Sequence, residues 1–135
     1  MSTQLRILLV EGDPFVRQAL SAALAGACGA EVWETASTEH GLALALEHKP
    51  DLVLMDLGVP GIDGLALCQA IAEHSELMMT KLWIMTGVTL DEKTRAALAC
   101  YADRLIQMPI SAAVICAEIR AQIEPSGPPL EWLGE

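Results

Sequence analysis

The sequence predicts a three-layer α/β/α fold, in which helices cover both faces of a five-stranded parallel sheet. Short apolar runs alternate with longer stretches of helical periodicity along the 135 residues. The runs at 7–10, 52–55 and 82–85 are wholly apolar, as expected for central strands buried on both faces. The runs at 30–35 and 104–107 carry charged or polar residues, which suit the edges of a sheet. Together these observations predict the strand order 2-1-3-4-5 and five helices.

The first strand, 7–10, leads into a helix that begins at Pro14, because a proline loses nothing by lacking its N–H in a first helical turn. Apolar residues then recur at helical spacing until Gly26 and Gly29 end the helix. A second strand follows at 30–35.

The next helix covers about residues 39–48 and is stopped by Pro50. The third strand, 52–55, ends at Asp56, and a Gly/Pro-rich loop follows it. Asp63 is placed to cap a helix that runs to about residue 74.

After the fourth strand, 82–85, Thr89 and Glu92 match a capping box that opens the following helix. The fifth strand, 104–107, precedes a last helix at about 111–123. This succession of elements is a flavodoxin-like arrangement. It predicts one domain over residues 1–124, followed by a Pro/Gly-containing segment, 125–135, that is a tail or a linker cut before another domain.

The amino-acid composition excludes some classes of binding partner. Hydrophobic residues make up 53% of the chain, enough for a core that needs no metal or disulfide. The formal net charge of −10 argues against direct binding of nucleic acid or an anionic membrane surface, since both would repel the chain. We therefore expect its output to pass through a downstream protein partner.

The four cysteines have neither metal-ligand spacing nor partners in a C-x-x-C motif. Each lies in an Ala- and Leu-rich stretch, which favours buried, structural free thiols (Cys28, Cys68, Cys100, Cys116). The start of the chain lacks the pattern of a signal peptide, and the longest weakly polar stretch is too short to span a bilayer. A soluble, cytoplasmic protein is predicted.

Side chains from several strand ends are expected to meet where the strand order reverses. Glu11 and Asp13 follow the first strand, and Asp56 ends the third. Thr86 and Met108 follow the fourth and fifth. Because neighbouring carboxylates repel one another without a cation, the sequence predicts an acidic cleft suited to Mg²⁺, with a hydroxyl and a thioether at its rim.

Structural roles compete with this interpretation. For Asp13, capping of the first helix is favoured over metal ligation, whereas for Asp56 the functional role is favoured because a loop follows it directly. Other phosphate chemistries fit less well. A flavin-phosphate loop would need hydroxyl donors after the first strand, and a dehalogenase-type phosphatase would need an Asp where Gly58 stands. No P-loop motif is present in the sequence.

The sequence resembles the receiver domain of a two-component response regulator, a CheY-like fold, over about residues 4–124. The residues that carry the resemblance lie in register across the predicted scaffold: Asp51-Leu52-Val53-Leu54-Met55-Asp56, Pro60-Gly61, Asp63-Gly64-Leu65, Ile7-Leu8-Leu9-Val10-Glu11, Thr86-Gly87 and Pro109.

The resemblance implies that Asp56 accepts a phosphoryl group from a phosphohistidine on a sensor histidine kinase or phosphotransfer protein. It implies a Mg²⁺ ion held by Asp56, by acids at the positions of Glu11 and Gly12, and by the backbone carbonyl of Gly58. It also implies that the Thr86 hydroxyl bonds a phosphoryl oxygen.

Three positions depart from the family pattern. Gly12 stands where a second acid is expected, Met108 where a lysine precedes Pro109, and Leu105 where a tyrosine or phenylalanine is usual. Asp13 offers a substitute metal ligand from one residue later. Mg²⁺ binding is therefore doubtful, and we expect phosphorylation of Asp56 to be weak, short-lived or absent.

The favoured function is an atypical receiver domain in phosphorelay signalling. The first alternative is a phosphorylation-independent pseudo-receiver that binds partners, or a second copy of itself, through the face of the fourth helix, fifth strand and fifth helix (Lys93, Arg95, Arg104, Arg120). The second alternative is a small metal-dependent phosphohydrolase using Asp56 and Glu11. It lacks a second aspartate and a general base, so we do not expect an enzyme.

Overall fold

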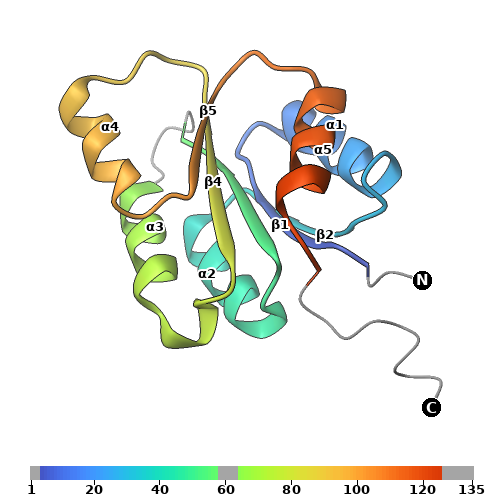
Figure 1. The fold of residues 1–135 in the computed structure, drawn as a ribbon, viewed down its shortest axis with the longest axis horizontal. Helices are drawn as coiled ribbons and strands as arrows, with labels where there is room; N and C mark the ends of the chain where they lie inside the picture. Colours follow the sequence, from blue (N-terminus) through green and yellow to red (C-terminus); the bar gives the residue numbers. More distant parts are fainter. Residues whose placement is uncertain (1–3, 58–63, 126–135) are drawn as a thin grey trace.

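The computed structural model describes residues 4–57 and 64–125, and within them one parallel sheet has the order β2-β1-β3-β4-β5. Its strands are β1 (Arg6–Val10), β2 (Glu31–Thr35), β3 (Leu52–Asp56), β4 (Lys81–Thr86) and β5 (Arg104–Gln107). The strands that contain the apolar runs 7–10, 52–55 and 82–85 are central and the more polar strands are at the edges, so the predicted order is confirmed (Figure 1).

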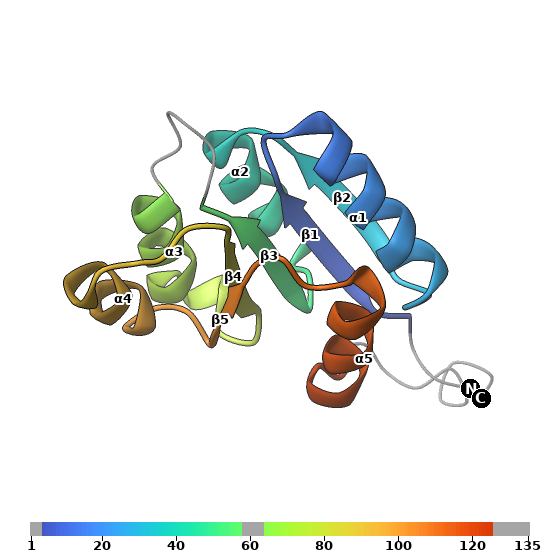
Figure 2. The same ribbon diagram turned by 90° about the horizontal axis from the view of Figure 1, so that it is seen from above.

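Helices cover both faces of this sheet. They are α1 (Pro14–Gly26), α2 (Thr38–His48), α3 (Gly64–Glu73), α4 (Glu92–Ala99) and α5 (Ala112–Gln122), with a short 3₁₀ helix, η1 (Ser75–Leu77), that the sequence analysis did not predict. Figures 1 and 2 show α1 and α5 on one face, and α2, α3 and α4 on the other. The predicted three-layer architecture is confirmed.

Alternation along the central strands divides the core into two apolar layers. In β1, Ile7 and Leu9 pack with α1 and α5, whereas Leu8 and Val10 pack with α2, α3 and α4. Successive side chains of a strand point to opposite faces, so a strand covered on both sides needs apolar residues at every position. This explains why the three central strands read as uninterrupted apolar runs.

One predicted helix start is wrong. The residue that caps α4 is Asp91, whose Oδ1 accepts a hydrogen bond from the Thr94 backbone N–H at 2.7 Å, and not Thr89. A Thr89 cap would start the helix at Leu90, but that side chain is partly buried against the α2/α3/α4 layer. An aspartate directly before the helix satisfies its first free N–H groups instead. Asp63, the predicted cap of α3, lies outside the described residues.

All four cysteines are free thiols. Cys68 and Cys116 are buried and Cys28 is half-buried, but Cys100 is exposed, so the predicted burial is wrong for that residue. Cys100 follows the last residue of α4, a helix in which only Leu98 is buried. The domain boundary at 124 stays a prediction, since nearly all of the predicted tail lies outside the described residues. Within the described ranges, no helix is long and apolar enough to cross a membrane.

Candidate functional site

Glu11 and Asp56 come together at the carboxyl edge of the sheet. Asp56 is the last residue of β3, and Glu11 directly follows β1. These strands are neighbours, and Val10 of β1 is paired with Met55 of β3. The residues that follow this pair, Glu11 and Asp56, therefore lie side by side. The structure therefore brings together the two carboxylates that the sequence analysis expected to meet.

The Glu11 carboxyl group is almost fully buried, with 1% of the residue exposed. Its Oε1 accepts a hydrogen bond from the Asp13 backbone N–H at 3.1 Å. No donor faces its buried Oε2 among the described residues. Burial, and secondarily a hydrogen bond to the Asp56 carboxyl group, raise the pKa of Glu11 to about 8. The raised pKa favours the protonated, uncharged form of Glu11 at neutral pH, beside the Asp56 carboxyl group.

The Asp13 carboxylate caps α1, as the sequence analysis favoured. Its Oδ1 accepts hydrogen bonds from the backbone N–H groups of Phe15, at 2.9 Å, and Val16, at 3.3 Å. Within residues 4–57 and 64–125, no three His, Cys, Asp or Glu side chains are gathered closely enough to hold a metal ion. The carbonyl of Gly58 lies outside the described residues, so its predicted role stays a prediction.

Replacing Asp13 by alanine is expected to lower the free energy of unfolding by about 1 kcal/mol, because two N–H groups of α1 lose their acceptor. Urea unfolding followed by circular dichroism measures this loss. Ser111→Ala is the matched control, since it removes the cap of α5 away from the acidic pair. A fall in Mg²⁺ affinity without any loss of stability would contradict a capping role and make Asp13 a metal ligand.

Arg17 holds the backbone of the β1–α1 loop. Its Nη1 donates to the carbonyl oxygen of Glu11 at 2.8 Å and to that of Gly12 at 3.4 Å. Its Nε lies 3.6 Å from Glu34 Oε1 on the edge strand β2. The guanidinium is thus committed to the loop carbonyls and to Glu34, and does not stand in for the lysine expected at position 108.

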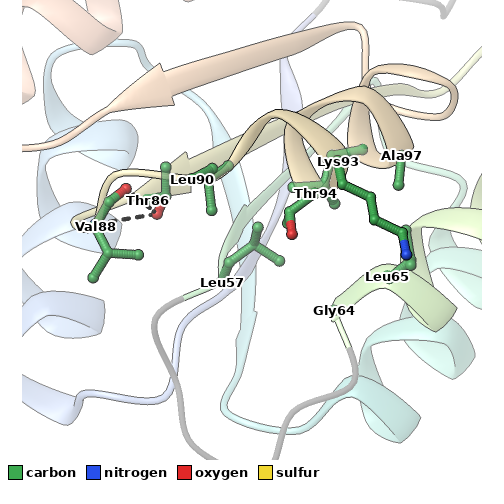
Figure 3. A pocket seen from close by; sticks show the side chains of 10 residues that line it. Leu57, Gly64, Leu65, Thr86, Val88, Leu90, Lys93, Thr94 and Ala97 are labelled. Carbon is green, nitrogen blue, oxygen red and sulfur yellow. Dashed lines mark hydrogen bonds between the residues drawn. The ribbon is translucent and has the colours of Figure 1, made fainter.

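Thr86, the last residue of β4, lies beside a pocket of about 480 Å³ (Figure 3). Its Oγ1 donates to the Val88 carbonyl at 3.1 Å and accepts from the Val88 N–H at 3.2 Å. The Lys93 side chain reaches Leu65 at the other end of the pocket, away from Thr86 (Figure 3). Sequence reasoning missed this pocket because its walls come from segments far apart in the chain, including Leu57.

Met108 and Leu105 are apolar at the two positions where the resemblance leads us to expect a cation and an aromatic ring. The Met108 side chain packs against the α1/α5 layer, and its N–H donates to the Thr86 carbonyl at 2.7 Å. The peptide bond between Met108 and Pro109 is cis. Leu105 packs against the α2/α3/α4 layer. Neither side chain brings charge to the cleft.

The four basic residues of the predicted interaction face are not equivalent. Arg104 pairs with Glu118, with 2.7 Å between Nη2 and Oε1, and lies over the Trp83 ring. Arg120 donates to the Ala27 carbonyl oxygen at the end of α1, at 3.2 Å. Lys93 and Arg95 are exposed on α4. Two of the four cations are thus already bound within the chain, and the face itself stays a prediction.

A parallel 2-1-3-4-5 sheet with carboxylates at the ends of β1 and β3 and a hydroxyl at the end of β4 defines a receiver-type signalling module. Residues 7–120 match the response regulator receiver domain family, and the chain belongs to that family. It is accordingly a module of two-component signalling and not a classical enzyme, which sets the phosphohydrolase alternative aside. Receiver domains partner with histidine kinases.

Known proteins agree with this assignment. The chain is 35% identical over 115 residues to the transcriptional regulatory protein AfsQ1 of Streptomyces coelicolor, covering 85% of this chain and 49% of that protein. It thus spans about half the length of the curated relatives it matches. The chemotaxis response regulator CheY4 of Vibrio cholerae shares the fold, with a TM-score of 0.77 at 24% identity, covering 88% of this chain and 98% of that one.

A third comparison concerns the receiver domain of the sensor histidine kinase PA1611 from Pseudomonas aeruginosa. Its TM-score is 0.77 at 21% identity, covering 88% of this chain and 97% of that one. That structure has a magnesium ion coordinated in its active-site cleft. At this identity the likeness shows the fold alone, and with CheY4 it confirms the predicted CheY-like architecture.

Proposed function

We propose that this chain is the receiver domain of a phosphorelay, with Asp56 as its phosphoacceptor and a sensor histidine kinase or phosphotransfer protein as its donor. The observation that carries the proposal is the position of Asp56, at the end of a buried central strand and against the buried Glu11 carboxyl group. A carboxylate oxygen held there would act as the nucleophile in an in-line attack on a phosphoryl group, and the product would be an acyl phosphate.

The donor set supports a weak Mg²⁺ site. Among the described residues no donor faces the buried Oε2 of Glu11, and the Asp56 carboxyl group lies beside that of Glu11. Oxygen ligands of this kind suit Mg²⁺, which also retains several waters. When bound, Mg²⁺ would neutralise charge that develops on the phosphoryl oxygens. Two side chains are one fewer than the family pattern provides, because Gly12 brings none.

The remaining residues of the cleft contribute unequally to this proposal. The Thr86 hydroxyl must turn away from the Val88 carbonyl to donate to a phosphoryl oxygen. An ideal Cβ built on Gly87 meets nothing within 4 Å, so there is room for that oxygen. Met108 supplies no charge to pair with the phosphoryl group, and Leu105 supplies no aromatic ring to respond to Thr86. Phosphorylation of Asp56 is therefore expected to be slow or short-lived.

The output in this proposal is a protein contact made in the cytoplasm. A net charge of −10 disfavours nucleic acid as a direct ligand, so a downstream protein or a second copy of the chain would bind the α4–β5–α5 face. The exposed cations Lys93 and Arg95 are its available charges. The receiver domain would end near residue 124, with 125–135 as a tail or the start of a linker.

The test is the intact mass of the protein after incubation with acetyl phosphate and Mg²⁺. We expect a substoichiometric single phosphoryl adduct that Asp56→Asn abolishes completely. An adduct that persists in Asp56→Asn would contradict the assigned phosphoacceptor. If circular dichroism shows that the protein is folded but no adduct forms, the result would favour the first alternative, a phosphorylation-independent pseudo-receiver that binds its partners constitutively.

A further inference from the structure

Two thiols meet where the end of α1 packs against α5. Cys116 lies on the buried side of α5, and Cys28 lies in the connection between α1 and β2. Both pack in the same apolar layer between these helices and the sheet. Cys116 is buried and Cys28 is half-buried, so only Cys28 is open to a reagent from solvent.

Contacts on both sides of the pair fix its position. The Cys116 Sγ–H donates to the Ala23 carbonyl oxygen at 3.6 Å, in the last turns of α1. One turn further along α5, Arg120 donates to the Ala27 carbonyl oxygen at 3.2 Å, directly before Cys28. The thiol of Cys116 is also near enough to that of Cys28 to contribute, as a hydrogen-bond partner, to the raised pKa of Cys28. The contact of the Cys116 thiol with Ala23 and that of Arg120 with Ala27 thus place the two cysteines in the same part of the boundary between α1 and α5.

We propose that Cys28 and Cys116 form a redox modification site that closes an intrachain disulfide when a low-molecular-weight disulfide oxidises the pair. The Cys28 thiolate attacks the oxidised reagent, which forms a mixed disulfide and releases one thiol. Cys116 then attacks the Cys28 sulfur atom, which forms the S–S bond and releases the second thiol. Two protons and two electrons leave the protein, and one reagent disulfide is reduced to two thiols.

The reaction is slow at neutral pH and accelerates as the pH rises. Burial, and secondarily a hydrogen bond with the Cys116 thiol, raise the pKa of Cys28 to about 12. The nearby Arg120 guanidinium has the opposite effect and lowers this pKa. Because only the thiolate attacks, the rate rises by about tenfold per pH unit below that pKa. The pair therefore responds to sustained oxidation and not to brief exposure.

The other two cysteines behave differently. Cys100 is exposed directly after α4, so we expect it to form a mixed disulfide that no second thiol resolves. Cys68 is buried and its pKa is also raised to about 12 by burial. The double variant Cys68→Ala/Cys100→Ser removes both side reactions and keeps the proposed pair.

The experiment incubates this double variant with glutathione disulfide at about pH 8.5, where the thiolate is more abundant than at neutrality. The expected product has lost the mass of two hydrogen atoms, and proteolysis without reductant yields one cross-linked peptide that contains both cysteines. The midpoint of thermal unfolding rises by on the order of 10 °C, because the new bond closes a loop that holds most of the chain.

A further substitution, Cys28→Ser, in the same background must abolish the cross-linked peptide while the circular dichroism spectrum stays unchanged. The proposal is overturned if the folded protein stops at a glutathione adduct on Cys28, or stays reduced, while the same protein unfolded in urea closes the disulfide. That result would show that the native packing keeps the two sulfur atoms out of bonding geometry.

Discussion

Gly12→Asp combined with Met108→Lys is expected to raise the rate at which Asp56 accepts phosphate from acetyl phosphate by about a hundredfold or more. The aspartate adds a carboxylate beside the pair that Glu11 and Asp56 form among the described residues. The lysine adds a cation next to Thr86, whose carbonyl already accepts the backbone N–H of residue 108. Each change supplies charge stabilisation of the transferred phosphoryl group that the natural chain lacks.

Single substitutions separate the two contributions. Gly12→Asp alone should raise Mg²⁺ affinity and make phosphorylation depend more steeply on Mg²⁺, whereas Met108→Lys alone should raise the rate at saturating Mg²⁺. Gly12→Ala with Met108→Leu is the matched control, because it changes the same positions without adding charge. Asp56→Asn in the double variant must remove all labelling. If the double variant is phosphorylated no faster than the natural chain, charge at positions 12 and 108 is not what limits the reaction.

The free energy of unfolding is expected to fall as pH rises from about 4.5 to about 8, and Glu11 is the cause. Its pKa is about 8 in the folded chain, against 4.5 when it is exposed. Between these values the folded chain binds more protons than the unfolded chain, so each rise in pH favours unfolding. Across the window the loss is on the order of several kcal/mol. Urea unfolding at a series of pH values measures it.

Glu11→Gln should flatten this pH dependence, because an amide is neutral throughout the window. Glu39→Gln, an exposed position near the start of α2, is the matched control and should leave the slope unchanged. Mg²⁺ should partly restore the stability of the natural chain at high pH, since a bound cation would compensate the negative charge of the Glu11 carboxylate beside Asp56. A slope that is the same in Glu11→Gln and the natural chain would refute the assignment to Glu11.

Strand order and the acidic pair could be predicted from the sequence because both depend on properties that are local in the chain. A strand buried on both faces must be apolar at every residue, so the apolar runs at 7–10, 52–55 and 82–85 predict the central strands. Once the order is known, side chains that follow β1 and β3 must meet at one edge of the sheet. The positions of Glu11 and Asp56 follow from that alone.

The missed features depend on packing between distant segments. Cys100, at the end of α4, and Cys116, within α5, both lie in Ala-rich stretches, and only the position of each helix on the sheet decides which thiol is buried. The direction of the Arg17 side chain, which extends from α1 to Glu34 on β2, likewise depends on a residue far from it in the sequence. The pocket beside Thr86 is lined by Leu57, which follows β3, and by residues of α3, α4 and the segment between β4 and α4. Contacts between segments so far apart leave no pattern in the sequence from which they could be predicted.

The hydrogen bonds of Arg17 also affect how the cleft meets a ligand. Its guanidinium joins the carbonyl oxygens of Glu11 and Gly12 to the Glu34 carboxylate, so the acidic wall of the cleft is tied to the edge of the sheet. The β1–α1 loop is therefore ordered before any phosphoryl donor or cation arrives. The conformational entropy of arranging that loop is lost when the domain folds, and it is not lost a second time when a ligand binds.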